Sequence, residues 1–149
     1  MKFVKQLAPL AVALGAVISI HAGTAGAGPV KTKDVCLAAP TGGGGFNTFV
    51  LREVDPLVPG GAVALRGIYF NTGSTRLEPL DGAVVMGSDG RMRIGFFVHS
   101  TAESLNDFTV SGVLDANWAG TVGYDNDGDY KNNGTLDMQK VDCGTVVIP

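Results

Sequence analysis

The residues whose type and spacing most suggest chemistry form one acidic run, Asp125-Asn126-Asp127-Gly128-Asp129. Carboxylates at alternate positions suit Ca²⁺, which takes several hard oxygen ligands. The run departs from the helix-flanked calcium loop, since its glycine stands fourth rather than sixth and no glutamate occupies the twelfth position. Asp-Gly is also an ordinary turn dipeptide. We therefore expect either a turn here or a calcium site formed by Asp125, Asp127 and Asp129, and no other cofactor.

Side chains for nucleophilic or acid–base catalysis are scarce. The sequence holds two histidines, His21 and His99, and His21 falls within the first 27 residues, which are expected to be removed as a signal peptide. Ser100 follows His99 directly, so on a strand the two side chains point to opposite faces and cannot form a catalytic pair. Two facing carboxylates can hydrolyse glycosides without a histidine, but the acids here fall in turns or at polar strand positions. We expect a protein that is not an enzyme.

The first 27 residues are expected to direct export. A short basic start, Met1-Lys2-Phe3-Val4-Lys5, precedes an uncharged apolar run over residues 7–20, and Ala25-Gly26-Ala27 has the small-x-small pattern that a signal peptidase cleaves. The apolar run is too short for a good transmembrane helix. We interpret residues 1–27 as a signal peptide and residues 28–149 as a single domain that is secreted or periplasmic.

The charge and hydropathy of the exported domain limit the classes of partner that we expect it to bind. Loss of Lys2 and Lys5 with the signal peptide changes the formal net charge from −3 to −5. An acidic domain without a Lys/Arg cluster is a poor partner for nucleic acid or an anionic membrane surface. Residues 28–149 contain no second long apolar segment, so we expect no membrane span. The partners that remain are a small molecule or an extracellular protein.

The two cysteines, Cys36 and Cys143, are expected to form a disulfide. An even pair in an oxidising compartment is most simply a bridge, and this bridge would enclose nearly the whole domain. A loop of that size is credited with roughly 4 to 5 kcal/mol in the chain-entropy account of disulfides. Two free thiols or a shared metal are the alternatives, but no His or Cys partner is nearby in the sequence.

Alternation of apolar and polar residues predicts a succession of strands. In the range 91–100 the apolar residues Met92, Ile94, Phe96 and Val98 occupy every second position, which is the period of a strand with one buried face. Turn residues such as Gly87-Ser88-Asp89-Gly90 join successive runs, which favours an antiparallel meander. The expected strands are 35–38, 46–54, 62–70, 80–86, 91–100, 107–115, 118–124 and 135–141.

Five successive expected strands each contain a glycine near the middle: Gly67, Gly82, Gly95, Gly112 and Gly123. Glycine inside a strand marks a bulge, a bend or the close approach of another backbone. Its repetition in strand after strand suits a sheet that coils strongly enough to close on itself. We predict an all-β fold, a small antiparallel meander barrel of about eight strands, with a β-sandwich as the alternative.

Three short segments carry a resemblance to a known family. They are Pro79-Leu80-Asp81-Gly82, Ile94-Gly95-Phe96-Phe97-Val98 and Phe108-Thr109-Val110-Ser111-Gly112. They resemble the central strands of avidin-type, calycin-like small barrels. Biotin capture in that family relies on several tryptophans, whereas this chain has only Trp118 and carries Ser100 where the family pattern has an aromatic residue. The resemblance therefore implies a small barrel rather than biotin binding.

The expected function is non-catalytic binding of a small apolar or amphipathic ligand at the mouth or in the interior of the barrel. Trp118, Tyr69 and Phe97 are the aromatic residues that we expect to contact either such a ligand or a partner surface, although each also suits a structural role. The alternative is an extracellular structural or adhesive module that contacts a partner protein and is steadied by Ca²⁺ at the acidic run.

Overall fold

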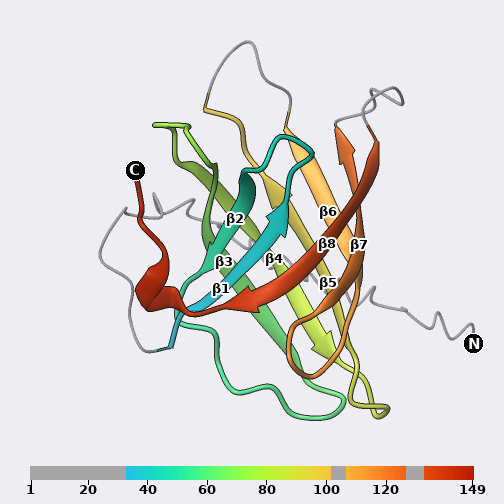
Figure 1. Ribbon diagram of the computed structural model, residues 1–149. Helices are drawn as coiled ribbons and strands as arrows, with labels where there is room; N and C mark the ends of the chain where they lie inside the picture. The colour runs from blue at the N-terminus through green and yellow to red at the C-terminus, as the bar shows by residue number, and fades with distance from the viewer. Residues whose placement is uncertain (1–32, 102–106, 127–132) are drawn as a thin grey trace, which may run out of the picture.

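The computed structural model of the protein describes residues 33–101, 107–126 and 133–149. These residues form strands and one short 3-10 helix (Figure 1). The elements are β1 (Val35–Pro40), β2 (Phe46–Leu51), β3 (Ala62–Asn71), β4 (Glu78–Met86), β5 (Met92–Val98), β6 (Phe108–Leu114), β7 (Gly120–Asn126), β8 (Gly134–Val141) and η1 (Cys143–Thr145).

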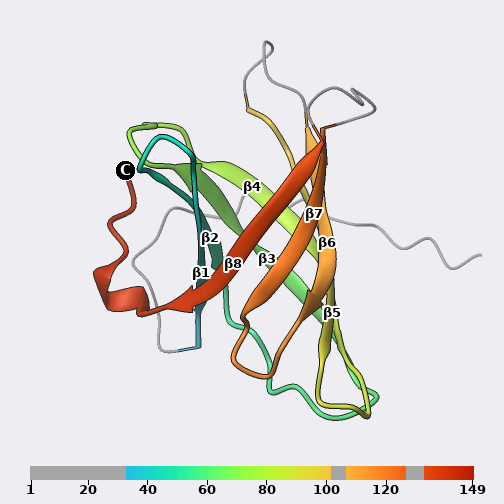
Figure 2. The same ribbon diagram turned by 45° about the vertical axis from the view of Figure 1, so that its right-hand side comes forward.

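The eight strands close into a barrel in which each strand pairs antiparallel with its sequence neighbours and β8 pairs with β1. The closing register sets Cys36 opposite Val141 and Ala38 opposite Gln139. The strands run obliquely around the barrel in two views (Figure 1, Figure 2), as closure of a twisted sheet requires. The expected antiparallel meander barrel is confirmed, and the two halves do not separate into a β-sandwich.

The barrel has two ends with different loops. Figure 1 shows loops 41–45 and 72–77 at the top, which we call the upper end. Loops 52–61, 87–91 and 115–119 lie at the bottom, which we call the lower end. The distinction matters because the two ends are packed differently.

The end of one strand and the start of another differ from expectation, and in both cases the backbone explains why. The strand expected at 46–54 ends at Leu51, because Arg52 forms an ion pair of 2.7 Å with Asp34 and Glu53 adopts a left-handed φ of 49°. The strand expected at 118–124 begins only at Gly120. Trp118, with a φ of 63°, lies in the preceding turn, a conformation that bulky residues rarely adopt.

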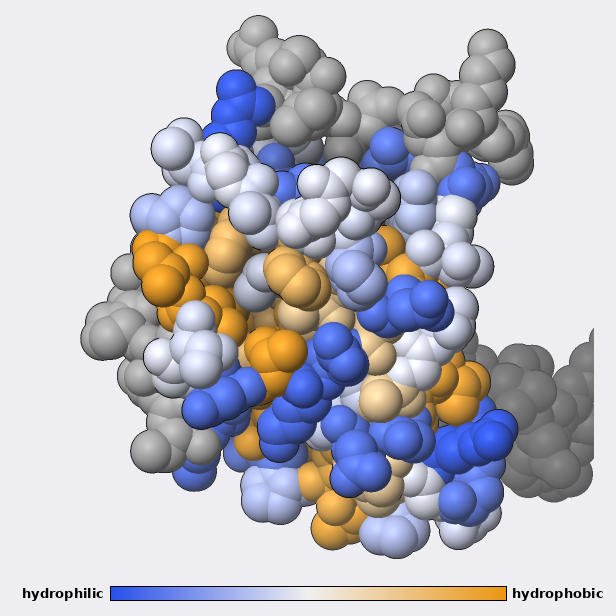
Figure 3. Space-filling view, in the orientation of Figure 1, coloured by the Kyte–Doolittle hydropathy of each residue, from blue (hydrophilic) through white to orange (hydrophobic). Residues whose placement is uncertain are grey.

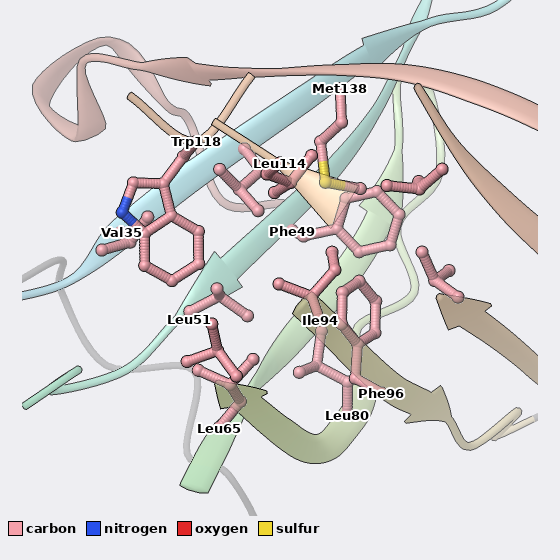
Figure 4. Packing of buried hydrophobic residues seen from close by; sticks show 14 of the residues in the cluster. Val35, Phe49, Leu51, Leu65, Leu80, Ile94, Phe96, Leu114, Trp118 and Met138 are labelled. Carbon is pink, nitrogen blue, oxygen red and sulfur yellow. The ribbon is translucent and has the colours of Figure 1, made fainter. Parts of the chain in front are cut away.

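The inward-facing residues of all eight strands form one packed core. Figure 4 shows Phe49, Ile94 and Met138, from different strands, converging on the same interior. Trp118 joins them from the lower end, beside Val35 (Figure 4). The buried members are Val35, Leu37, Phe49, Leu51, Leu65, Tyr69, Leu80, Val84, Met92, Ile94, Phe96, Val98, Val110, Leu114, Trp118, Val122 and Met138. Side chains therefore fill the middle and the lower end of the barrel.

A second, smaller cluster lies on the outer side of β1, β2 and β3. Its buried members are Cys36, Val50, Ile68 and Phe70. The C-terminal segment after β8 turns along this outer wall (Figure 2) and packs Val146 and Ile148 against it. Figure 3 shows orange, hydrophobic surface at the left of the molecule, the side on which the C-terminal segment runs in Figure 1. We call this group the outer cluster.

The predicted disulfide between Cys36 and Cys143 is present and joins β1 to the C-terminal segment at the outer cluster. The bridged residues are separated by 107 positions, and their Cα atoms are 5.3 Å apart, within the usual range for a bridge. The bond therefore fastens the last segment of the chain to its first strand.

Three of the five mid-strand glycines are required by close backbone approach. A Cβ on Gly67 would lie 2.0 Å from the carbonyl oxygen of Val50, and one on Gly82 would lie 2.2 Å from that of Gly95. Gly112 is similarly crowded by Val122. Gly95 and Gly123, by contrast, face outward with open space or ordinary contacts around them. Strong coiling of the wall thus explains the inward glycines and not the other two.

Candidate functional site

A hollow of about 380 Å³ opens at the upper end of the barrel. Its lining comes from the end of β3, the β3–β4 loop, the start of β4, the start of β6 and the end of β7. The lining residues are Tyr69, Phe70, Asn71, Ser74, Arg76, Glu78, Phe108 and Asn126. The site is therefore assembled from strand termini, which the closed register holds in fixed relation.

Cross-strand pairing places the polar side chains of this rim next to one another. Tyr69 on β3 is the register partner of Glu78 on β4, and Asn71 is the partner of Asn47 on β2. On the far side, Phe108 is opposite Asn126. Residues directly opposite in an antiparallel pair lie close enough for their side chains to interact, so the ends of the strands form a polar rim above the core.

Aromatic rings form the floor beneath the rim. The ring centroid of Tyr69 lies 5.0 Å from that of Phe49 and 5.1 Å from that of Phe108. Phe49 also meets Phe96 at 5.3 Å in an edge-on arrangement. These tilted and edge-on geometries are the favoured ones for aromatic pairs. The floor is thus rigid and apolar, and it separates the hollow from the filled interior.

Tyr69 links floor and rim because its ring is buried while its hydroxyl reaches the polar layer. The hydroxyl donates a hydrogen bond of 2.8 Å to Oδ1 of Asn47. Burial, and next the nearby Glu78 carboxylate, raise the pKa of Tyr69 to about 12, against a smaller lowering influence from Asn71. Both main causes disfavour a phenolate, so Tyr69 is a neutral hydrogen-bonding group across the physiological range.

Glu78 is the charged residue most enclosed by this site, with only 7% of its surface exposed. Burial raises the pKa of its carboxyl group, and Asp107 adds to that effect, whereas the Arg76 guanidinium lowers it. Asp107 is itself engaged, since its Oδ1 accepts a hydrogen bond of 2.6 Å from the Ser100 amide. The rim therefore combines a desolvated carboxyl with an exposed cation.

The three aromatic residues expected to contact a ligand or partner are not brought together. Tyr69 lines the hollow at the upper end. Trp118 is buried at the lower end as part of the core. Phe97 faces outward on β5, where its ring meets that of His99 at 4.8 Å. Of the three, Tyr69 is the one placed at the candidate site.

The expected calcium ligands are not assembled within the described chain. Asp125 is exposed near the end of β7, and Asp127 and Asp129 lie outside the described residues. Within residues 33–101, 107–126 and 133–149, no group of three or more His, Cys, Asp or Glu side chains is arranged to hold a metal ion. The calcium site therefore stays a prediction.

His99 lies on the outer wall, away from the hollow. Its Nε2 atom is 2.5 Å from Oδ1 of Asp81, and both side chains are about half exposed or more. The neighbouring residue Ser100 uses its backbone amide to bind Asp107. This outer pair is a surface contact.

Sequence reasoning did not select Glu78, Asn47 or Asn71 as site residues. The sequence does contain a signal for two of these residues. Glu78 lies two positions before Leu80, and Asn47 lies two positions before Phe49, so on a strand each points to the same face as that apolar residue. Polar residues in the apolar phase of a strand face the interior. Their common location at one end becomes evident only once the strand register is known.

Comparison of the chain with protein-family models, with curated proteins and with solved structures finds no match. The three segments that resemble avidin-type barrels lie on the adjacent strands β4, β5 and β6. No helix in the described part of the chain has the length and apolar character needed to cross a membrane. The site itself is thus the basis for a functional proposal.

Proposed function

We propose that the protein is an exported, non-catalytic barrel that binds a small amphipathic molecule in the hollow at its upper end. The observation that carries the proposal is the difference between the two ends. Trp118 and its neighbours fill the lower end, whereas the upper end keeps a hollow of about 380 Å³ between an aromatic floor and a polar rim. Ligand sites in proteins commonly occupy roughly 300–1,000 Å³ and combine apolar walls with a few polar groups.

The chemistry of the lining supports binding rather than catalysis. In the described lining the polar side chains are amides, one hydroxyl of Ser74, the phenol of Tyr69, the guanidinium of Arg76 and the carboxyl of Glu78. Such groups donate and accept hydrogen bonds, while His99 lies on the outer wall. The disulfide is consistent with an extracellular or periplasmic location, which accords with export through the N-terminal segment.

Native mass spectrometry of protein purified from its own host tests the proposal. We expect wild-type protein to carry an additional small-molecule mass that is released on denaturation. A Ser74→Trp variant should lose this mass, because Ser74 lies at the rim and an indole there occupies the hollow. Ser88→Trp is the matched control, since Ser88 is exposed in the turn at the opposite end.

Two results would contradict this function. One is a wild-type protein with only its own mass under gentle ionisation and no small molecule in an organic extract. The other is a bound molecule that both tryptophan variants retain equally, because that result places the ligand away from the upper hollow.

A further inference from the structure

Glu78 is a buried acidic residue at the upper hollow. The residue is 7% exposed and belongs to the lining. Within the described part of the chain, no hydrogen bond or ion pair reaches its carboxyl group. Buried polar groups in proteins are ordinarily hydrogen-bonded, and buried charges are ordinarily paired. The site thus leaves one acidic group to be satisfied by whatever occupies the hollow.

The surroundings of Glu78 favour a cation over an anion. Among the described residues, Asp107 and Arg76 are the charged groups that act on it, one of each sign. Counting Glu78 itself, two carboxyl groups face one guanidinium. Arg76 is exposed, so solvent screens its charge more than it screens that of the enclosed carboxyl. Of the two charged residues in the lining, Glu78 and Arg76, the carboxyl is therefore the less screened.

The aromatic floor adds to this preference. Tyr69 stands directly opposite Glu78 in the strand register, and its ring packs against Phe108, which also lines the hollow. Aromatic faces attract ammonium groups, and this attraction grows when the cation is partly desolvated. Asn71 and Asn126 belong to the same lining, and the oxygen of an amide side chain can accept further hydrogen bonds.

Resting on the proposed function, we propose that the ligand of the upper hollow carries a protonated amine that binds the carboxylate of Glu78, with its apolar body against the rings of Tyr69 and Phe108. A charge-assisted hydrogen bond from an ammonium group is stronger than a neutral one. A neutral ligand leaves the carboxylate without an ionic partner, and an anionic ligand is repelled by the enclosed carboxylate of Glu78.

Three probes of similar size and different charge test this proposal: 2-phenylethylammonium, 2-phenylethanol and phenylacetate. Each is titrated into the disulfide-bonded protein while the NMR signals of Tyr69, Phe108 and Asn126 are followed. We expect the ammonium probe to bind at least about tenfold more tightly than the other two. Glu78→Gln should abolish this preference. Asp81→Asn should preserve it, because Asp81 offers the same charge change on the outer wall of the same strand.

Arg76→Gln keeps the test decisive even where Glu78→Gln fails to fold, because Arg76 is exposed. Removing this cation should tighten binding of the ammonium probe and weaken binding of phenylacetate.

Equal binding of the ammonium and the alcohol at the upper hollow would overturn the amine assignment and leave the proposed function standing. Tighter binding of phenylacetate than of the other two probes would also overturn the amine assignment and leave the proposed function standing. No shift at the three residues with any probe, together with a bare mass from the host, would remove both proposals.

Discussion

Folding buries most of the Glu78 residue without giving its carboxyl group a hydrogen bond or an ion pair within the described part of the chain. A group in this position destabilises the fold whenever it is ionised. A bound ligand that supplies a partner for the carboxylate would remove this destabilisation. Residues kept for binding therefore often lower the stability of the unoccupied protein. Glu78 is therefore a residue at which function and stability oppose each other.

We expect Glu78→Gln to raise the free energy of unfolding at pH 7 by roughly 1 kcal/mol, because a neutral amide is cheaper to bury than a carboxylate. Folding raises the pKa of Glu78 above its ordinary value of 4.5. The folded protein therefore holds this proton more tightly than the unfolded chain, and the wild-type protein loses stability as the pH rises from 4.5 through the raised pKa. Urea denaturation at several pH values measures this, with wild type and variant converging in stability below pH 4.5.

Asp81→Asn is the control for that measurement, since its carboxylate is largely exposed on the outer wall. We do not expect Asp81→Asn to raise the free energy of unfolding at pH 7, because this carboxylate stays in contact with water in the folded protein. A Glu78→Gln variant that is less stable than wild type at pH 7 would show that the carboxylate makes a stabilising contact, contrary to the enclosed and unpaired environment described above.

Tyr69 makes a second prediction at the scale of the single residue. Tyr69→Phe removes the hydrogen bond to Asn47 and should lower the free energy of unfolding at neutral pH by about 1 kcal/mol. Because folding raises the pKa of Tyr69 from 10.0 to about 12, wild-type stability falls as the pH rises across that interval. The variant should lack this alkaline fall. Ultraviolet difference titration checks the assignment, because the phenol that titrates latest in the wild-type protein should be missing from Tyr69→Phe. A variant that still shows this phenol would contradict the assignment.

At the scale of the strand, glycines that look equivalent in sequence have different roles. Gly82 on β4 pairs with Phe96 in the register, and Gly95 on β5 pairs with Ala83, so the two glycines lie one position apart on adjacent strands. A Cβ on Gly82 would lie 2.2 Å from the carbonyl oxygen of Gly95, whereas nothing lies within 4 Å of a Cβ on Gly95. The side of the wall on which each glycine lies thus decides whether the fold requires it.

We expect Gly82→Ala to cost about 3 kcal/mol or more, because the backbone of β5 must move to admit the methyl group. Gly95→Ala should instead stabilise the protein by about 0.5 kcal/mol, because alanine loses less backbone entropy on folding and meets no obstacle. Thermal and urea denaturation of the two variants measure both effects at neighbouring register positions. Equal losses in the two variants would show that outward glycines are also needed for coiling.

The alternation of apolar residues was enough to predict most of the barrel, and the reasons are visible in particular elements. Met92, Ile94 and Val98 on β5 are buried as their spacing predicts, because a strand with one covered face has a strict period. The start of β7 was not predictable in the same way. Trp118 continues the alternation but adopts a φ of 63° in a turn, where Asp115 Oδ1 accepts hydrogen bonds from the amides of Asn117 and Ala119.

The site was harder to predict than the fold, because it depends on register rather than on periodicity. Glu78 and Tyr69 belong to strands whose pairing is fixed by closure of the whole wall. A shift of one residue in either strand would have turned one of these side chains to the outside. Sequence reasoning selected Tyr69 as an expected aromatic contact, but it could not show that Glu78 is its neighbour.

At the scale of the whole molecule, the closed wall and the C-terminal segment form two packed layers of unequal size. The barrel core continues from the lower end to the aromatic floor, while the outer cluster covers only one side of β1, β2 and β3. The Cys36–Cys143 disulfide holds the smaller layer in place. A segment that follows the last strand and packs through a few residues has little stability of its own, so the covalent link should account for much of its order.

Replacing both cysteines with alanine should lower the free energy of unfolding by about 4 to 5 kcal/mol, the amount that the chain-entropy account assigns to a loop of about this length. Part of the measured loss would come from packing, because Cys36 is fully buried in the outer cluster. Reduced wild-type protein separates the two contributions, since it lacks the cross-link and keeps both sulfur atoms. We expect urea denaturation to show that reduction alone causes most of this loss in the free energy of unfolding. The alanine variant should lose slightly more than the reduced protein. A reduced protein as stable as the oxidised one would mean that strand closure alone holds the C-terminal segment.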